Sequence, residues 1–108
     1  MHEVWLLAQP PILHVACKTL EHAKALLVIA NESGLRNSGI ISLKKNIARI
    51  TSSERIETLL ALNKKVFVNK EYIAVLAQKA NEKFLRGREK LRKFEEEIEE
   101  AKEKLLSL

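Results

Sequence analysis

The C-terminal part of the chain carries a helical pattern that is long for a protein of 108 residues. Asn69 is a suitable N-cap, and one helix from there to the C-terminus would be roughly 55 Å long at about 1.5 Å per residue. Its apolar or small residues alternate in steps of three and four, as in a heptad seam: Ile73, Ala77, Ala80, Phe84, Gly87, Leu91, Phe94, Ile98, Ala101, Leu105 and Leu108. We expect the first half to pack on a sheet. The second half, residues 88–108, is expected to project as a helical tail that needs a partner, unless the helix breaks at Gly87.

The rest of the chain indicates one buried helix among short strands. Strand-like segments occupy residues 3–9, 12–17, 40–43, 47–51, 55–62 and 66–68. Pro10 and Pro11 separate the first two, because proline cannot donate to a central ladder. Thr19 is a suitable N-cap for a helix that ends at Gly34, and short polar connections favour an antiparallel meander. The sequence therefore predicts a single α+β domain over residues 1–108, with an antiparallel or mixed sheet, one buried helix and a long C-terminal helix.

The formal net charge of +5 is unevenly distributed along the chain. Seven lysines and arginines lie between residues 79 and 93, against two glutamates, and glutamates dominate afterwards. A basic stretch of this kind attracts a polyanion such as tRNA by counterion release. The candidate tRNA contacts are Lys79, Lys83, Arg86, Arg88 and Arg92. A solvated helix whose charges pair from i to i+4 is an equally weighted alternative.

Cysteine usage and hydropathy indicate a cytoplasmic protein. Cys17 is the only cysteine, so no internal disulfide can form. No segment reaches the roughly 20 apolar residues that span a bilayer, and the N-terminus lacks a signal-peptide pattern. All the acidic residues are glutamate and lysine is abundant, which favours a heat-adapted source.

The stretch GLRNSGI, residues 34–40, combines a guanidinium, an amide, a hydroxyl and two glycines. A loop that exposes such groups together with backbone N–H groups is typical of sites that hold phosphates or carboxylates. The same residue types are what a tight turn after a helix needs, so a simple turn is the competing interpretation.

Other candidate residues also have simple structural explanations. His14 lies in a strand, where a histidine is more often a hydrogen-bonded core residue than a catalyst. Trp5 could stack on a base, although an aromatic residue near a strand end is more often in the core. Cys17 and His22 lack the partners and spacing of a zinc site, so we expect no metal. The stretch TSSER, residues 51–55, has no nearby histidine base in the sequence and indicates a turn.

Three segments of the chain resemble the family of the third tRNA wybutosine-synthesis enzyme: VWLLAQPPILHVACKTLEHAKALLVIANESGLRNSGIISL, SSERIE and EYIAVLAQKANEKFLRGREKL. The resemblance implies an S-adenosylmethionine-dependent methyltransferase that acts on N4 of the 7-aminocarboxypropyl-demethylwyosine base at position 37 of tRNA-Phe. Members of that family normally carry an upstream region with a Ser-Ser-Cys-Ser-Gly-Arg signature. The chain therefore resembles the C-terminal part of the enzyme, and we expect little activity from it alone.

The resemblance also implies roles for the matched residues, which are expected to line one pocket. His14 and Ser38 are the expected catalytic residues, and Arg36, Asn37, Ser38 and Gly39 are expected to bind S-adenosylmethionine. The expected partners are tRNA and either a second copy of the chain or an upstream-fragment chain. Two alternatives remain open: a noncatalytic tRNA-binding module and a coiled-coil assembly protein.

Overall fold

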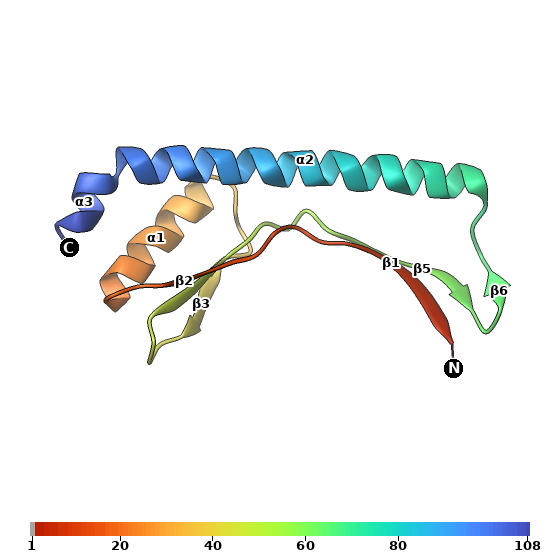
Figure 1. The fold of residues 1–108 in the computed structure, drawn as a ribbon, viewed down its shortest axis with the longest axis horizontal. Helices are drawn as coiled ribbons and strands as arrows, with labels where there is room; N and C mark the ends of the chain where they lie inside the picture. The colour runs from red at the N-terminus through yellow and green to blue at the C-terminus, as the bar shows by residue number, and fades with distance from the viewer. Residues whose placement is uncertain (1) are drawn as a thin grey trace.

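The computed structural model describes residues 2–108 and confirms the α+β class with antiparallel strands and a long C-terminal helix (Figure 1). Its elements follow in the order β1 (Glu3–Ala8), β2 (Leu13–Ala16), α1 (Leu20–Glu32), β3 (Gly39–Ser42), β4 (Ile47–Ile50), β5 (Ile56–Leu62), β6 (Lys65–Val66), α2 (Lys70–Glu100) and α3 (Lys102–Leu106). The helix α2 runs along one side of the molecule, above α1 at one end and above an arched β-ribbon along the rest of its length (Figure 1).

The strands form a long bent ribbon. The two hairpins of the predicted meander are confirmed, because β3 pairs with β4 and β5 with β6, but β4 and β5 do not pair with each other. β1 pairs antiparallel with β5 and β2 pairs antiparallel with β4, so the two N-terminal strands run against residues 47–62. β3 extends this ribbon at one end and β6 at the other, in two sheets of order β2-β4-β3 and β1-β5-β6. The ladder is interrupted at Pro10 and Pro11, which lack the N–H group that a ladder needs. There the ribbon bends, and the Thr51 hydroxyl donates to the Pro11 carbonyl oxygen at 2.9 Å.

The helix α1 supplies one side of the hydrophobic core. Its N-cap is Thr19, as predicted, with Oγ1 accepting from the His22 N–H at 3.2 Å, and Gly34 follows its C-cap at a φ of 97°. The buried residues of the helix are Ala23, Leu26 and Ala30. They face the β2-β4-β3 sheet, where Ala48 and Ile50 alternate along β4 on the same buried side.

The helix α2 is continuous over 31 residues, or roughly 46 Å at about 1.5 Å per residue. Asn69 caps it as predicted, because Oδ1 accepts from the Tyr72 N–H at 2.8 Å. The helix passes through Gly87 without a break and ends at Glu100, with Ala101 as its C-cap, where the chain turns into α3. No helix within residues 2–108 is both long and apolar enough to cross a membrane.

The second half of α2 packs in the core, contrary to the prediction, and in the first half Leu76 is the buried apolar residue. Phe94, in the second half, is 5% exposed and belongs to the core, and Leu91 and Ile98 pack against that core. In the first half, Ile73 and Phe84 of the same seam are exposed. Residues 88–108 therefore do not project as a free tail, because α1 and the β2-β4-β3 sheet lie beneath them (Figure 1). The periodic pattern identifies the apolar face of a helix but not which part of that face meets the core.

Replacement by alanine should have opposite effects on the stability of the fold at two of the glycines. A Cβ at Gly87 would lie at an ordinary 3.6 Å from Ser52 Oγ, so Gly87→Ala should stabilise the fold by about 0.5–1 kcal/mol through helix propensity. A Cβ at Gly34 would lie 3.1 Å from the Lys90 side chain, at a φ that alanine disfavours. Gly34→Ala should therefore destabilise the fold by about 1–2 kcal/mol. Urea unfolding of the two variants measures both effects. Equal destabilisation would contradict the structure at Gly87, where Ser52 lies close to the helix but leaves room for a Cβ atom.

Candidate functional site

The loop 34–39 joins α1 to β3 and is fastened to the segment that follows β4. The Ser38 hydroxyl accepts from the Thr51 backbone N–H at 3.0 Å and donates to the Leu35 carbonyl oxygen at 2.7 Å. The Asn37 N–H donates to the Thr51 carbonyl oxygen at 3.2 Å. Leu35 anchors the start of the loop in the core at 1% exposed. These contacts hold the loop at the bend of the ribbon and occupy the hydroxyl of Ser38 with backbone groups.

His14, Arg49 and Gly39 form a row across the β2-β4-β3 sheet. His14 pairs with Arg49 on one side of β4, and Gly39 pairs with Arg49 on the other. Paired residues of antiparallel strands share a face of the sheet, and this face lies opposite the buried Ala48 and Ile50. His14 is exposed, so it is not a core histidine. A Cβ at Gly39 would meet no atom within 4 Å, which leaves open space beside Arg49.

A cavity of about 150 Å³ lies at the bend of the ribbon. Its polar lining is contributed by Gln9, Asn37, Arg49, Thr51, Ser52 and Arg55. Within the described residues, Arg49 Nε and Ser52 Oγ are buried without a hydrogen-bond partner. The Arg55 guanidinium forms an ion pair with the Glu57 carboxylate at 2.7 Å through one of its nitrogens. We call this space the bend cavity.

A junction beside the bend cavity attaches α2 to the ribbon. Gly87 is buried against Ser52, and one turn further along the helix Lys90 forms an ion pair with Glu54. The aliphatic part of the Lys90 side chain passes Gly34, so the same side chain also contacts the end of α1. The bend, α1 and the middle of α2 therefore hold one another in place around the cavity.

The Glu54 carboxyl group has a pKa below its ordinary value. Burial alone would raise this pKa, but the hydrogen bond and charge of Lys90, together with the nearby Ser52 hydroxyl, lower it by more. The Ser52 hydroxyl lies close enough to Glu54 to stabilise the ionised carboxylate, although the two groups do not meet the geometry of a hydrogen bond. Because the pKa is lowered on folding, the pair stabilises the fold above the ordinary pKa of glutamate and loses this contribution as the pH falls through the lowered value.

Of the predicted site residues, Asn37 alone lines the bend cavity. Arg36 is exposed on the loop and does not line the cavity. Trp5 lies on β1, paired with Leu59, and its Nε1 donates to the Glu3 carboxylate at 3.0 Å. Its ring is half exposed, at 49%, so one part of the indole surface is open to a ligand. The structure thus places Asn37 in the cavity wall, Ser38 against Thr51 and Gly39 beside Arg49, with Arg36 exposed next to them on the same loop and Trp5 apart on β1.

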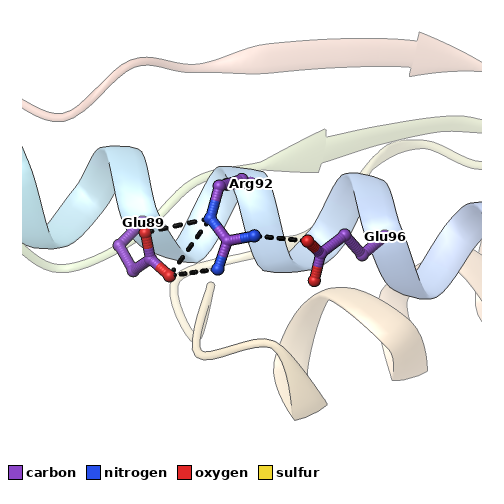
Figure 2. A network of polar contacts seen from close by, with 3 residues as sticks. All are labelled: Glu89, Arg92 and Glu96. Atoms are coloured by element: carbon purple, nitrogen blue, oxygen red, sulfur yellow. Dashed lines mark hydrogen bonds and ion pairs between the residues drawn. The ribbon is translucent and has the colours of Figure 1, made fainter.

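The predicted basic contacts on α2 divide into paired and unpaired residues. Arg92 lies between Glu89 and Glu96, bonded to both (Figure 2), and these carboxylates raise its pKa. Lys79 pairs with Glu82 at 3.2 Å. Within residues 2–108, Lys83, Arg86 and Arg88 form no ion pair, and the two arginines are exposed. The i to i+4 alternative therefore describes Arg92, whereas Arg86 and Arg88 keep their charge available.

Sequence reasoning missed the residues that line the bend cavity from β4 and beyond. Arg49 received no role, and the stretch 51–55 was interpreted as a turn. The available signal was an arginine inside the apolar strand Ile47–Ile50, on the face opposite its buried residues. The pairing of β4 with β2 and β3 was also needed, since this pairing is what sets Arg49 beside His14 and Gly39.

The fold and the site define a small α+β protein with a polar cavity at the bend of a β-ribbon, beneath a long helix. The family model of Methyltransferase TYW3 matches residues 1–100, and the chain belongs to this family. The family resemblance of the sequence motifs is confirmed. Within the described residues, no three side chains of the metal-binding types form a group that could hold a metal ion.

The chain spans about half the length of the curated relatives it matches. A relative from Archaeoglobus fulgidus, named tRNA(Phe) 7-((3-amino-3-carboxypropyl)-4-demethylwyosine(37)-N(4))-methyltransferase, is 43% identical over 95 residues, 88% of this chain and 48% of the relative. A Xenopus laevis relative, named tRNA wybutosine-synthesizing protein 3 homolog, is 36% identical over 94% of this chain and 41% of its own length. The solved structure of the PH1069 protein from Pyrococcus horikoshii has a TM-score of 0.81 and 39% identity, over 89% of this chain and 50% of that one.

Proposed function

We propose that this chain forms half of an S-adenosylmethionine-dependent tRNA methyltransferase. The proposed reaction is methylation of N4 of the 7-aminocarboxypropyl-demethylwyosine base at position 37 of tRNA-Phe. The observation that carries the proposal is the match of residues 1–100 to a methyltransferase family. The name of the Archaeoglobus fulgidus relative supplies the reaction, and the agreement of the fold with a solved relative supports the match.

The loop 36–39 suits the binding of the methyl donor. S-adenosylmethionine supplies a methyl group on a sulfonium and carries a nucleoside and a charged amino-acid end. The open space at Gly39 lets such a ligand approach the backbone, and the Asn37 amide lies in the wall of the bend cavity. We assign cofactor binding to Arg36, Asn37 and Gly39. Ser38, predicted as catalytic, is proposed as a positioning residue, because its hydroxyl fastens the loop to Thr51.

His14 is the proposed proton acceptor. Methylation of an N–H group releases a proton, and a neutral imidazole near the reacting nitrogen can take it up. His14 is exposed on the sheet face that carries Arg49 and Gly39, so a base docked on that face is within its reach. Methyl transfer otherwise depends chiefly on holding the methyl carbon in line with the nitrogen.

The unpaired arginines of α2 are the proposed tRNA contacts. Replacing Arg86 and Arg88 together by Gln should weaken tRNA binding and reduce the slope of log K against log salt by about 0.7–0.9 per lost phosphate contact. The matched control is Arg92→Gln, which should change the slope less because Glu89 and Glu96 already hold that guanidinium. Filter-binding titrations across a salt series measure both slopes. An unchanged slope in the double variant would mean that these charges only solvate the helix.

Exposed apolar side chains support association with a further polypeptide. On β1, Val4 and Leu7 are more than half exposed, and so are Val75 and Phe84 on the first half of α2. We propose that the partner is the half of the relatives' length that this chain does not match, rather than a second copy. For the assembled protein we propose the cytoplasm of a heat-adapted organism as its location, where its tRNA substrate is found.

The alternative functions are less well supported. A coiled-coil assembly protein would need the seam of α2 for a partner helix, but Leu91, Phe94 and Ile98 already pack in or against the core of this chain. A noncatalytic tRNA-binding module would bind tRNA but not the methyl donor. Calorimetric titration with S-adenosylmethionine, with and without the complementary half, tests the proposal. We expect binding in the assembled protein, and tRNA binding without cofactor binding would favour the noncatalytic module.

A further inference from the structure

Arg49 lies in the sheet where its guanidinium could bind a ligand. It lies half-buried on the central strand of the β2-β4-β3 sheet and forms no ion pair within residues 2–108. Its Nε is buried without an acceptor, although guanidinium N–H groups in proteins are normally hydrogen-bonded. The neighbouring position across the strand pair is Gly39, which leaves room for a group to reach Arg49.

The other walls of the bend cavity supply further donors. Ser52 is 2% exposed and lines the cavity, and its hydroxyl, which lies near Gly87 and the Glu54 carboxyl group, has no hydrogen-bond partner. Asn37 lines the same cavity. Arg55 also lines the cavity and keeps N–H groups beyond the one that Glu57 accepts. Guanidinium, amide and hydroxyl donors arranged together complement a small oxyanion, and the planar fork of arginine fits a carboxylate with two parallel hydrogen bonds.

We propose that the bend cavity binds the carboxylate of a 3-amino-3-carboxypropyl group, with Arg49 as its main partner and Ser52 and Asn37 as supporting donors. The identity of the group rests on the proposed function. The substrate base named for the relatives carries it, and the amino-acid end of S-adenosylmethionine is the same chemical group. A volume of about 150 Å³ suits a terminal carboxylate on a flexible arm. A phosphate inside a nucleic-acid chain is flanked by two sugars and fits such a recess less well.

Two matched pairs of ligands separate the two sources of this carboxylate. S-adenosylhomocysteine and 5′-methylthioadenosine share the adenosine and the sulfur, and only the first carries the arm. Likewise, tRNA-Phe with the aminocarboxypropyl arm on base 37 is compared with tRNA-Phe that carries 4-demethylwyosine. The protein assembled from this chain and the complementary half is titrated with all four by calorimetry, so no turnover is needed. The source of the carboxylate is identified by the pair in which the ligand with the arm binds more tightly.

The variant Arg49→Gln should remove that preference, a loss of about tenfold to a hundredfold for the ligand with the arm and little change for the ligand without it. Arg49→Lys should retain part of the preference, and Lys102→Gln, on the exposed surface of α3, should retain all of it. Circular dichroism confirms that each variant is folded. If neither pair shows a preference, or if the preference survives Arg49→Gln, the carboxylate assignment is wrong. That result leaves the proposed function untouched, because methyl transfer is measured separately.

Discussion

Replacing Phe94 by Ala is expected to lower the free energy of unfolding by about 3–5 kcal/mol, the largest single effect on stability that we predict. The ring is 5% exposed and lies in the core cluster with Leu26, Leu35 and Ile50. Its removal leaves a cavity where α2 crosses α1, at the contact that holds the second half of the long helix to the domain. A loss of this size is a large share of the stability of a small domain. Urea denaturation followed by far-ultraviolet circular dichroism measures it.

Phe84→Ala is the matched control, because it removes the same atoms from the same helix. Phe84 is 53% exposed, so its loss should cost much less, about 1 kcal/mol or below. Similar costs for the two variants would contradict the placement of the core beneath residues 91–98. A larger cost for Phe84 would support the opposite packing, in which the first half of α2 carries the contacts.

The local signals in the sequence predicted the elements well. Thr19 and Asn69 cap the helices expected of them, because a short polar side chain beside a helical segment can satisfy the first N–H groups. Pro10 and Pro11 separate β1 from β2 for the equally local reason that neither residue can donate to a ladder. These outcomes depend on a few neighbouring residues and not on the rest of the fold.

The features that depend on distant contacts were not predicted. The pairing of β4 with β2, and of β5 with β1, is decided by how the whole ribbon folds back on itself. Arg49 was overlooked for this reason, since its significance comes from its pairing with His14 on β2 and with Gly39 on β3. The residue types of the loop 34–39 identified it as a candidate site, yet only the structure shows that the Ser38 hydroxyl accepts a hydrogen bond from the backbone N–H of Thr51.

The second large effect concerns catalysis. We expect the 108-residue chain alone to methylate tRNA slower than the assembled protein by about three orders of magnitude or more. The groups that align a methyl donor with an acceptor act together, so half of a site retains far less than half of the rate. The bend cavity is open at the surface, and the exposed Trp5 and Leu7 share one face of β1 that the proposed second polypeptide would cover. In the assembled protein, His14→Ala should lower the rate of transfer and Ser38→Ala should weaken cofactor binding.

The most direct test is transfer of a labelled methyl group from S-adenosylmethionine to tRNA-Phe carrying the aminocarboxypropyl precursor base. Three samples are compared: this chain, a polypeptide corresponding to the unmatched half of the relatives, and the two combined. We predict label in the tRNA only for the combined sample, located on base 37, and its loss when the substrate tRNA lacks the precursor base. Equal transfer by this chain alone would contradict the account, and so would an inactive mixture of two halves that are folded and bound to each other.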